Sequence, residues 1–162
     1  MTEKISDKKV PKLVPQVVLV NPEIPQNTGN IARTTAALNT SLHLIRPLGF
    51  EITDKRVKRA GLDYWSETDV RFYDSWEQFL EKTKAQKLWF FTTKANKVYS
   101  KVNYTSDDYL VFGSETKGLA QSFHERYPDS RLKIPLDNQN IRSINLATAV
   151  AIALYCARAQ ID

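Results

Sequence analysis

The stretch QVVLVNPEIPQNTGNIART, Gln16–Thr34, joins an apolar run to a loop and to the start of a helix. The first five residues are rich in β-branched side chains and predict a strand buried on both faces. Two prolines, three asparagines and a glycine fall within the ten positions that begin at Asn21. A helix is expected from about residue 28 to residue 38, capped by Asn27 or Thr28. The loop is richer in turn-forming and hydrogen-bonding residues than a strand-to-helix connection requires, which makes it a candidate ligand site.

The rest of the chain also alternates between predicted strands and helices. Strands are expected at residues 42–45, 69–73, 87–93, 108–113 and 131–136, and helices at residues 53–61, 74–84, 119–126 and 145–160. Asp74 or Ser75 is expected to cap the second of these helices. The alternation predicts one α/β domain with a mainly parallel sheet and helices on both faces. Residues 1–15 are polar and rich in lysine, and we expect a flexible tail there, followed by a domain over residues 16–162.

The composition excludes several classes of protein. Lysine and arginine number 23 against 18 acidic residues, and the net charge of +5 suits a polyanionic partner. Cys156 and two histidines are too few for a zinc site of the usual spacing, and a lone cysteine fits a reducing compartment. The first fifteen residues lack the apolar segment of a signal peptide, and the apolar run at residues 146–157 is too short to cross a bilayer. We therefore expect a soluble, cytoplasmic protein with no membrane contact and no metal.

Three loops of unusual composition follow predicted strands: the loop from Asn21, FGSETKGLA (112–120) and IPLDNQNIRSINLA (134–147). Ligands of parallel α/β sheets bind outside the carboxyl ends of the strands, so these loops are the candidate site. The glycines lack the spacing of a dinucleotide-binding loop, and Leu119 and Ala120 stand where a P-loop needs Lys and Ser or Thr. No G-x-S-x-G elbow of a hydrolase is present. An enzyme built on these loops would belong to none of those classes.

Taken singly, the loops leave two interpretations open. Asn27 and Arg33 could contact a sugar or phosphate at a helix N-terminus, or they could be an ordinary cap and a surface ion pair. Glu115 lies between two glycines and is at least as well explained as a solvated turn residue. Ser143 and Asn145 precede the last helix, where both residue types are typical caps.

Taken together, the three loops resemble the three motifs of the SpoU branch of the SPOUT RNA methyltransferases. NTGNIAR (27–33), FGSETKGL (112–119) and IPL…RSINLATAV (134–150) match these motifs in order and spacing. NPEIPQNTGNIAR, PLGF, DKRVKRAGLDYW and IPL…RSINLATAVAIALYCA are most similar to the single-domain tRNA wobble-nucleotide (cytidine/uridine 34) 2′-O-methyltransferases. The similarity covers about residues 17–160, which is nearly the whole chain.

The resemblance implies a trefoil-knotted α/β fold, a homodimer, S-adenosylmethionine as cofactor and a tRNA anticodon loop as substrate. The residues that match the family's catalytic positions are Asn27, Arg33, Glu115, Ser143 and Asn145. The residues expected to hold the cofactor, largely through their backbone, are Phe91, Thr92, Gly113, Ile134, Leu136 and Ser143. The residues expected to contact RNA are Lys55, Arg56, Lys58, Arg59 and Tyr155.

Other interpretations remain open beside this resemblance. The basic run at residues 55–59 could equally be a solvated helix face. The substrate could be ribosomal RNA, or the chain could be a non-catalytic RNA-binding protein of the same fold. From the residues alone, an unrelated flavodoxin-like binding protein is also compatible with the alternating pattern.

Overall fold

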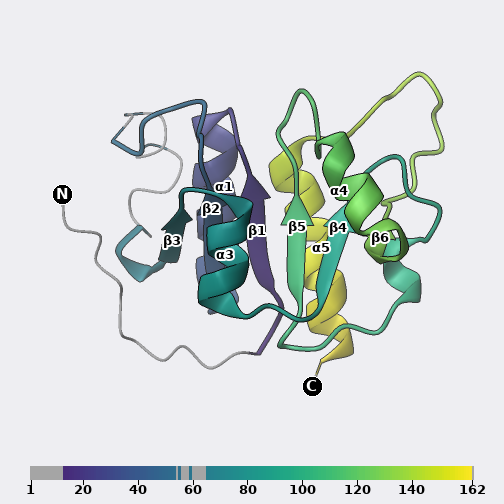
Figure 1. The fold of residues 1–162 in the computed structure, drawn as a ribbon, viewed down its shortest axis with the longest axis horizontal. Coiled ribbons are helices and arrows are strands. Elements are labelled where there is room, and N and C mark those ends of the chain that lie inside the picture. Colours follow the sequence, from purple (N-terminus) through teal and green to yellow (C-terminus); the bar gives the residue numbers. More distant parts are fainter. Residues whose placement is uncertain (1–12, 54, 56–58, 60–64, 162) are drawn as a thin grey trace.

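The computed structural model of the chain describes residues 13–53, 55, 59 and 65–161. Six strands form one sheet in the order β3-β2-β1-β5-β4-β6, and every neighbouring pair is parallel (Figure 1). The strands are β1 (Gln16–Val20), β2 (Ser41–Ile45), β3 (Asp69–Tyr73), β4 (Leu88–Phe91), β5 (Tyr109–Phe112) and β6 (Arg131–Leu132). The predicted parallel α/β domain is therefore confirmed, whereas the trefoil knot stays a prediction from the family resemblance.

Helices cover both faces of the sheet, as predicted (Figure 1). On one face lie α1 (Pro25–Ala37) and α5 (Leu146–Gln160), and on the other lie α3 (Trp76–Thr83) and α4 (Gln121–Arg126). Three short 3-10 turns complete the described elements: η1 (Trp65–Glu67), η2 (Tyr99–Lys101) and η3 (Pro128–Ser130). Within the described part of the chain, no helix is long and apolar enough to cross a membrane.

The central strand β1 is buried on both of its faces. Val17 and Leu19 belong to the core under α1 and α5, whereas Val18 and Val20 belong to the core under α3. All four are at most 7 % exposed. Because side chains alternate across a strand, a short run of β-branched residues can supply two cores at once. The predicted strand at residues 16–20 is confirmed, because burial of its side chains is a property that the local sequence alone indicates.

Two element boundaries differ from the prediction. Helix α1 begins at Pro25, and its N-cap is Ile24, which offers no side-chain cap. The predicted caps Asn27 and Thr28 instead lie inside the first turn of the helix and are buried. The last strand contains two residues rather than six, because Lys133 donates to the carbonyl of Lys97 in the connection between β4 and β5 and not to a strand. The predicted cap of α3 is confirmed, since the Ser75 hydroxyl accepts from the Gln78 amide at 3.1 Å.

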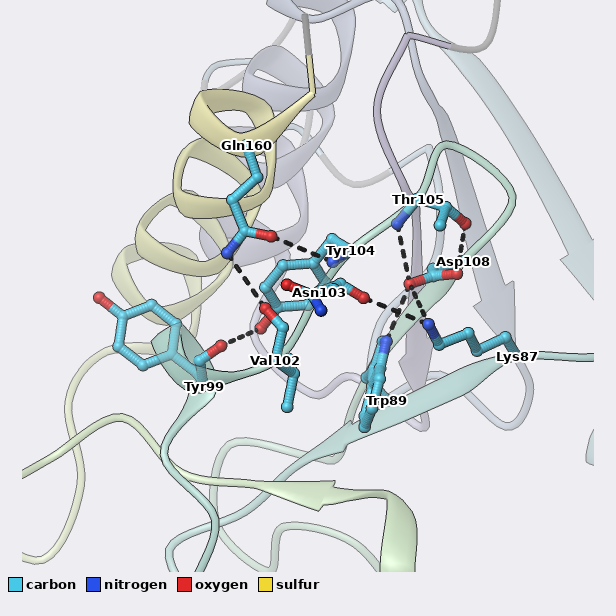
Figure 2. A network of polar contacts seen from close by, with 9 residues as sticks. All are labelled: Lys87, Trp89, Tyr99, Val102, Asn103, Tyr104, Thr105, Asp108 and Gln160. Atoms are coloured by element: carbon cyan, nitrogen blue, oxygen red, sulfur yellow. Dashed lines mark hydrogen bonds and ion pairs between the residues drawn. The ribbon is translucent and has the colours of Figure 1, made fainter.

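The C-terminal end of α5 is fastened to the connection that follows η2 (Figure 2). The side-chain amide of Gln160 accepts from the Tyr104 backbone amide at 3.1 Å and donates to the Val102 carbonyl at 3.1 Å. The Tyr104 hydroxyl, in turn, donates to the Tyr99 carbonyl at 2.6 Å. These bonds fix one end of α5, and the opposite end of the same helix lies at the cavity described below.

A fully buried carboxylate, that of Asp108, holds the start of β5 against β4 (Figure 2). It accepts from the Thr105 hydroxyl at 2.7 Å, from the Thr105 amide at 3.1 Å and from the Trp89 indole at 2.9 Å. The ammonium of Lys87 lies 3.7 Å away. A buried charge is tolerated only when it is paired and hydrogen-bonded, and Asp108 meets both conditions. This network lies at the amino ends of the strands, so it stabilises the sheet away from the candidate site.

Candidate active site

All three loops meet around one cavity at the carboxyl ends of β4 and β5. Its volume is about 470 Å³, which lies within the range of ordinary small-molecule sites. The sequence-predicted residues that line it are Asn27, Phe91, Thr92, Gly113, Glu115, Ser143 and Asn145. Residues from positions more than a hundred apart in the chain are thus brought to one place, where sheets of this kind bind ligands.

Glu115 supplies the cap that α1 lacks. One carboxylate oxygen accepts from the Glu23 amide at 2.7 Å, and the other accepts from the Ile24 amide at 3.0 Å and from the side chain of Asn27 at 3.3 Å. The backbone N–H groups at a helix start have no partner within the helix, and a negative charge there also interacts favourably with the helix dipole. Glu115 therefore joins the second loop to the first and fixes where α1 begins.

A tight hairpin presents Glu115 to the helix. Ser114 and Gly118 exchange two backbone hydrogen bonds of 3.2 and 2.9 Å, and Gly118 adopts a left-handed φ of 65°. At its tip, the Thr116 hydroxyl donates to the two carboxylate oxygens of Glu23 at 2.9 and 2.8 Å. The first and second loops are therefore joined by hydrogen bonds in both directions: Glu115 accepts from the first loop, and Glu23 accepts from the second.

The third loop is linked to the other two through a pair of asparagines. The Asn145 side chain donates to the Asn27 side-chain oxygen at 3.0 Å, and its own oxygen caps α5 by accepting from the Thr148 amide at 3.2 Å. A continuous set of hydrogen bonds therefore runs from Glu115 through Asn27 to Asn145. The predicted capping role of Asn145 is confirmed, and the same side chain also lines the cavity.

We predict that Glu115→Gln lowers the free energy of unfolding by about 1–3 kcal/mol, because the new amide group faces a backbone N–H that needs an acceptor. For a chain of this length, each 1 kcal/mol corresponds to a fall in Tm of about 2–4 °C. Thermal unfolding followed by circular dichroism measures it. The matched control is Glu23→Gln, because a glutamine oxygen can still accept from Thr116. Equal losses in the two variants would contradict the capping role.

The residues predicted to hold the cofactor surround two adjoining cavities. Phe91, Thr92 and Ser143 line both the larger cavity and a second one of about 100 Å³. Gly113 lines only the larger cavity, and Ile134 and Leu136 line only the smaller. All six residues are therefore brought together, although their assignment to the cofactor stays a prediction.

Arg33 lies apart from the cavity that Asn27 lines. It is exposed on α1, six residues after Asn27. In an α-helix, six residues correspond to about 9 Å of rise and a rotation of about 240°, so the two side chains leave the helix on different sides. Arg33 does not line either cavity of its own subunit.

The predicted RNA-contacting residues are only partly described. Lys55 and Arg59 are exposed and helical, whereas Arg56 and Lys58 lie outside the described residues. Tyr155 is 51 % exposed on α5 and lines neither cavity. Their assignment to RNA stays a prediction.

Several residues of the cavity wall were not predicted from the sequence. They are Ile24, Thr93, Lys94, Ser114, Thr116, Lys117, Gly118, Leu119, His124, Arg142, Ile144, Leu146 and Ala149. Two of them could have been predicted from the sequence. Lys94 directly follows a predicted strand that ends at Thr93, and Arg142 lies in the third motif directly before Ser143. Over the described ranges, no group of three or more His, Cys, Asp or Glu side chains is placed to hold a metal ion.

His124 on α4 is buried and forms part of the cavity wall. Burial lowers its pKa below the ordinary value, and the positive charges of Lys94 and Arg131 lower this pKa further. The Arg131 guanidinium lies 3.4 Å from its Nδ1, so this nitrogen is the acceptor in a neutral ring. His124 is therefore expected to be neutral and structural.

The lowered pKa of His124 predicts a pH dependence of stability. Because the unfolded chain then binds more protons near pH 6, stability should fall as the pH is lowered through the unfolded pKa towards the folded one. We expect His124→Gln to remove this contribution, which is at most about 1.4 kcal/mol per pH unit. Urea unfolding of both proteins at pH 7, 6 and 5, at one protein concentration, measures the difference. Parallel curves for the two proteins would contradict the prediction.

Comparison with known proteins agrees with the family resemblance of the three loop motifs. The model of the SpoU rRNA Methylase family matches residues 15–155. A Bacillus subtilis (strain 168) protein, provisionally named as a tRNA (cytidine(34)-2′-O)-methyltransferase, is 47% identical over 147 residues, which are 89% of this chain and 91% of the relative. A solved structure described as "Structural insights into the 2-OH methylation of C/U34 on tRNA" has a TM-score of 0.87 at 43% identity, covering 92% of this chain and 97% of the other.

A more distant neighbour shares the fold. The SpoU methyltransferase AviRb from Streptomyces viridochromogenes, solved in complex with the cofactor AdoMet, has a TM-score of 0.81 at 21% identity. The match covers 91% of this chain and 58% of that longer one.

Proposed function

The chain belongs to the SpoU rRNA Methylase family, and we propose that it transfers a methyl group from S-adenosylmethionine to the 2′-oxygen of the wobble nucleotide, cytidine or uridine 34, of tRNA. The observation that carries this proposal is the convergence of the three loops on one cavity, joined by the hydrogen bonds from Glu115 through Asn27 to Asn145. Relatives with the wobble-nucleotide assignment match the chain over nearly its full length.

The two adjoining cavities fit S-adenosylmethionine in size and chemistry. Phe91, Ile134 and Leu136 offer apolar surface for a base, and the loop backbone offers hydrogen-bonding groups for polar edges. When bound, the cofactor supplies an electrophilic methyl group on a sulfonium, so no metal is needed to activate it. The role of the loops is then to hold a ribose hydroxyl in line with this methyl group, and orientation of that kind is worth several kcal/mol.

Arg33 is proposed to stabilise the alkoxide that develops on the ribose 2′-oxygen. A guanidinium is always charged in proteins, so it cannot be the base that removes the proton. Its planar fork can instead donate to the 2′-oxygen and to the adjoining phosphate together. The proton then passes to a phosphate oxygen or to water.

The placement of Arg33 favours a site shared between two subunits. Its exposed position on α1, away from the cavity of its own chain, suits a guanidinium that reaches the cavity of a partner. Helices α1 and α5 pack against each other, and each carries an exposed apolar side chain: Tyr155 on α5 is 51 % exposed and Ile24, the N-cap of α1, is 41 % exposed. We propose a homodimer formed through α1 and α5, with Arg33 acting in trans.

The choice of RNA depends on the relatives rather than on the family description. That description names ribosomal RNA, whereas the B. subtilis relative and the solved structure are assigned to nucleotide 34 of tRNA. A nucleotide of an anticodon loop is unpaired and accessible, which suits a compact catalytic domain. We also propose a cytoplasmic location, which a tRNA substrate supports.

Cofactor binding gives the first test of this function. S-adenosylhomocysteine at about 100 times its Kd should stabilise the protein by about 2.7 kcal/mol, measured as a rise in Tm. Flavin mononucleotide at the same concentration is the control and should leave Tm unchanged. Stabilisation by flavin and not by S-adenosylhomocysteine would overturn the methyltransferase assignment in favour of a flavodoxin-like protein.

A further inference from the structure

Three positively charged side chains converge on the mouth of the larger cavity from three separate segments. Lys94 follows β4, Lys117 lies in the hairpin after β5, and Arg142 precedes α5. All three residues are exposed. In the described part of the chain, none of them forms an ion pair with a carboxylate. The charges therefore remain available to a ligand at the mouth.

The cavity wall offers little negative charge against these three cations. Its one acidic residue among those described is Glu115, whose oxygens already accept from two backbone amides and from Asn27. Arg131, which lies 3.4 Å from Nδ1 of His124 in this wall, adds a further positive charge close to the cavity. An anionic group entering the mouth is favoured electrostatically.

The charge distribution in the sequence supports a polyanion rather than one small anion. Between Glu81 and Asp107 the chain contains six lysines and no acidic residue. Lys94 and Lys97 follow β4, so positive charge at the carboxyl end of this strand extends beyond the cavity wall, whereas Lys82, Lys84 and Lys87 precede β4 at its amino end. Binding to a nucleic-acid backbone depends on such an extended arrangement.

Building on the proposed function, we propose that Lys94, Lys117 and Arg142 bind the RNA phosphates that flank the methylated nucleotide. A ribose hydroxyl cannot enter the cavity without bringing its two neighbouring phosphates to the mouth, where these side chains lie. Arg142 can bind a phosphate through two parallel N–H groups, whereas the lysines act as point charges. The three residues therefore position the strand, and they carry no base specificity.

The test is the salt dependence of tRNA binding for Lys94→Ala, Lys117→Ala and the double variant. Each lost phosphate contact should reduce the slope of log K against log[salt] by roughly 0.7–0.9, and the double variant by about twice that amount. Lys82→Ala is the matched control, because it removes one positive charge far from the cavity. Lys82 lies in the last turn of α3, near the amino ends of the strands. Its slope should equal that of the unchanged protein.

The affinity for S-adenosylhomocysteine, measured by calorimetry, separates two sources of negative charge. It should be unchanged in all variants if the cations bind RNA. An unchanged salt slope in the double variant, or a loss of S-adenosylhomocysteine affinity that indicates a contact with the cofactor carboxylate, would overturn the inference. Failure of the unchanged protein to bind any tRNA would overturn the proposed substrate itself, which is a different result from failure of the variants alone.

Discussion

Replacing Arg33 by alanine is expected to lower kcat about 10²–10³-fold, the usual loss on removing one donor to a developing oxyanion. The affinity for S-adenosylhomocysteine should stay within about twofold, because the proposed contacts of Arg33 are to the ribose 2′-oxygen and the phosphate of the RNA and not to the cofactor. Single-turnover methyl transfer and calorimetry measure the two quantities.

Arg33→Lys is the matched control for charge. It keeps the positive charge and loses the planar fork, so we expect most of the activity to be lost here as well. Full activity in the lysine variant would show that charge alone suffices. A loss of cofactor affinity in Arg33→Ala would contradict the role in the methyl-transfer step.

Gly113→Ala is expected to remove cofactor binding and to destabilise the fold. An added Cβ would lie 2.1 Å from the Gly118 carbonyl carbon and 2.3 Å from the Leu119 nitrogen, so the backbone of the hairpin must move. Overpacking of this kind costs about 1–3 kcal/mol or more, and each 1.4 kcal/mol expressed at the cavity wall weakens binding tenfold. Calorimetry with S-adenosylhomocysteine and thermal unfolding measure both effects.

Gly118→Ala is the control within the same hairpin. A Cβ at Gly118 meets no atom within 4 Å, so the only cost is the left-handed φ of 65°. We expect a loss of stability of about 1–2 kcal/mol and a smaller change in cofactor affinity. A larger effect at Gly118 than at Gly113 would contradict the packing argument.

The two alanine variants together test whether Arg33 acts across subunits. In a heterodimer purified through two different tags, the Arg33→Ala subunit keeps its cavity and can receive Arg33 from the Gly113→Ala subunit. Activity should then recover to about half of that of the unchanged dimer, because one of two symmetric sites is complete. No recovery in a folded heterodimer would indicate that Arg33 acts on the cavity of its own chain.

The sequence predicted the elements of this fold better than their arrangement. Strands such as β1 and β5 consist of apolar side chains whose burial is a local property, and they were found to within a residue or two. The order of the six strands depends on contacts between distant segments, and only the family resemblance could anticipate it. The shortness of β6 also depends on a contact between distant segments: the Lys133 amide donates to the Lys97 carbonyl, which lies in the connection after β4.

The start of α1 illustrates a prediction that was wrong for a physical reason. Local rules look for a capping side chain within the next few residues, and Asn27 and Thr28 satisfied them. The actual cap is the carboxylate of Glu115, about ninety residues later in the chain. Pro25 was the signal that could have corrected the boundary, because proline is favoured in the first turn of a helix.

The polar residues of the candidate site were predicted from the sequence, whereas the positive charges around the cavity were not. Asn27, Glu115 and Asn145 carry recognisable motifs, and the structure brings them into hydrogen-bonding contact. The cations at the mouth, Lys94 and Lys117, are ordinary lysines in the sequence until the fold places them on one rim. Their common location could not be predicted locally, because Lys94 and Lys117 come from different loops that only the fold brings to one cavity.

The most direct test of the proposed function is the transfer of tritiated methyl groups from S-adenosylmethionine to total tRNA and to ribosomal RNA, with nuclease digestion to locate the label. We expect label on the 2′-oxygen of nucleotide 34 of tRNA, and its loss in Arg33→Ala. Label found only in ribosomal RNA, or at another position of tRNA, would contradict the proposed substrate.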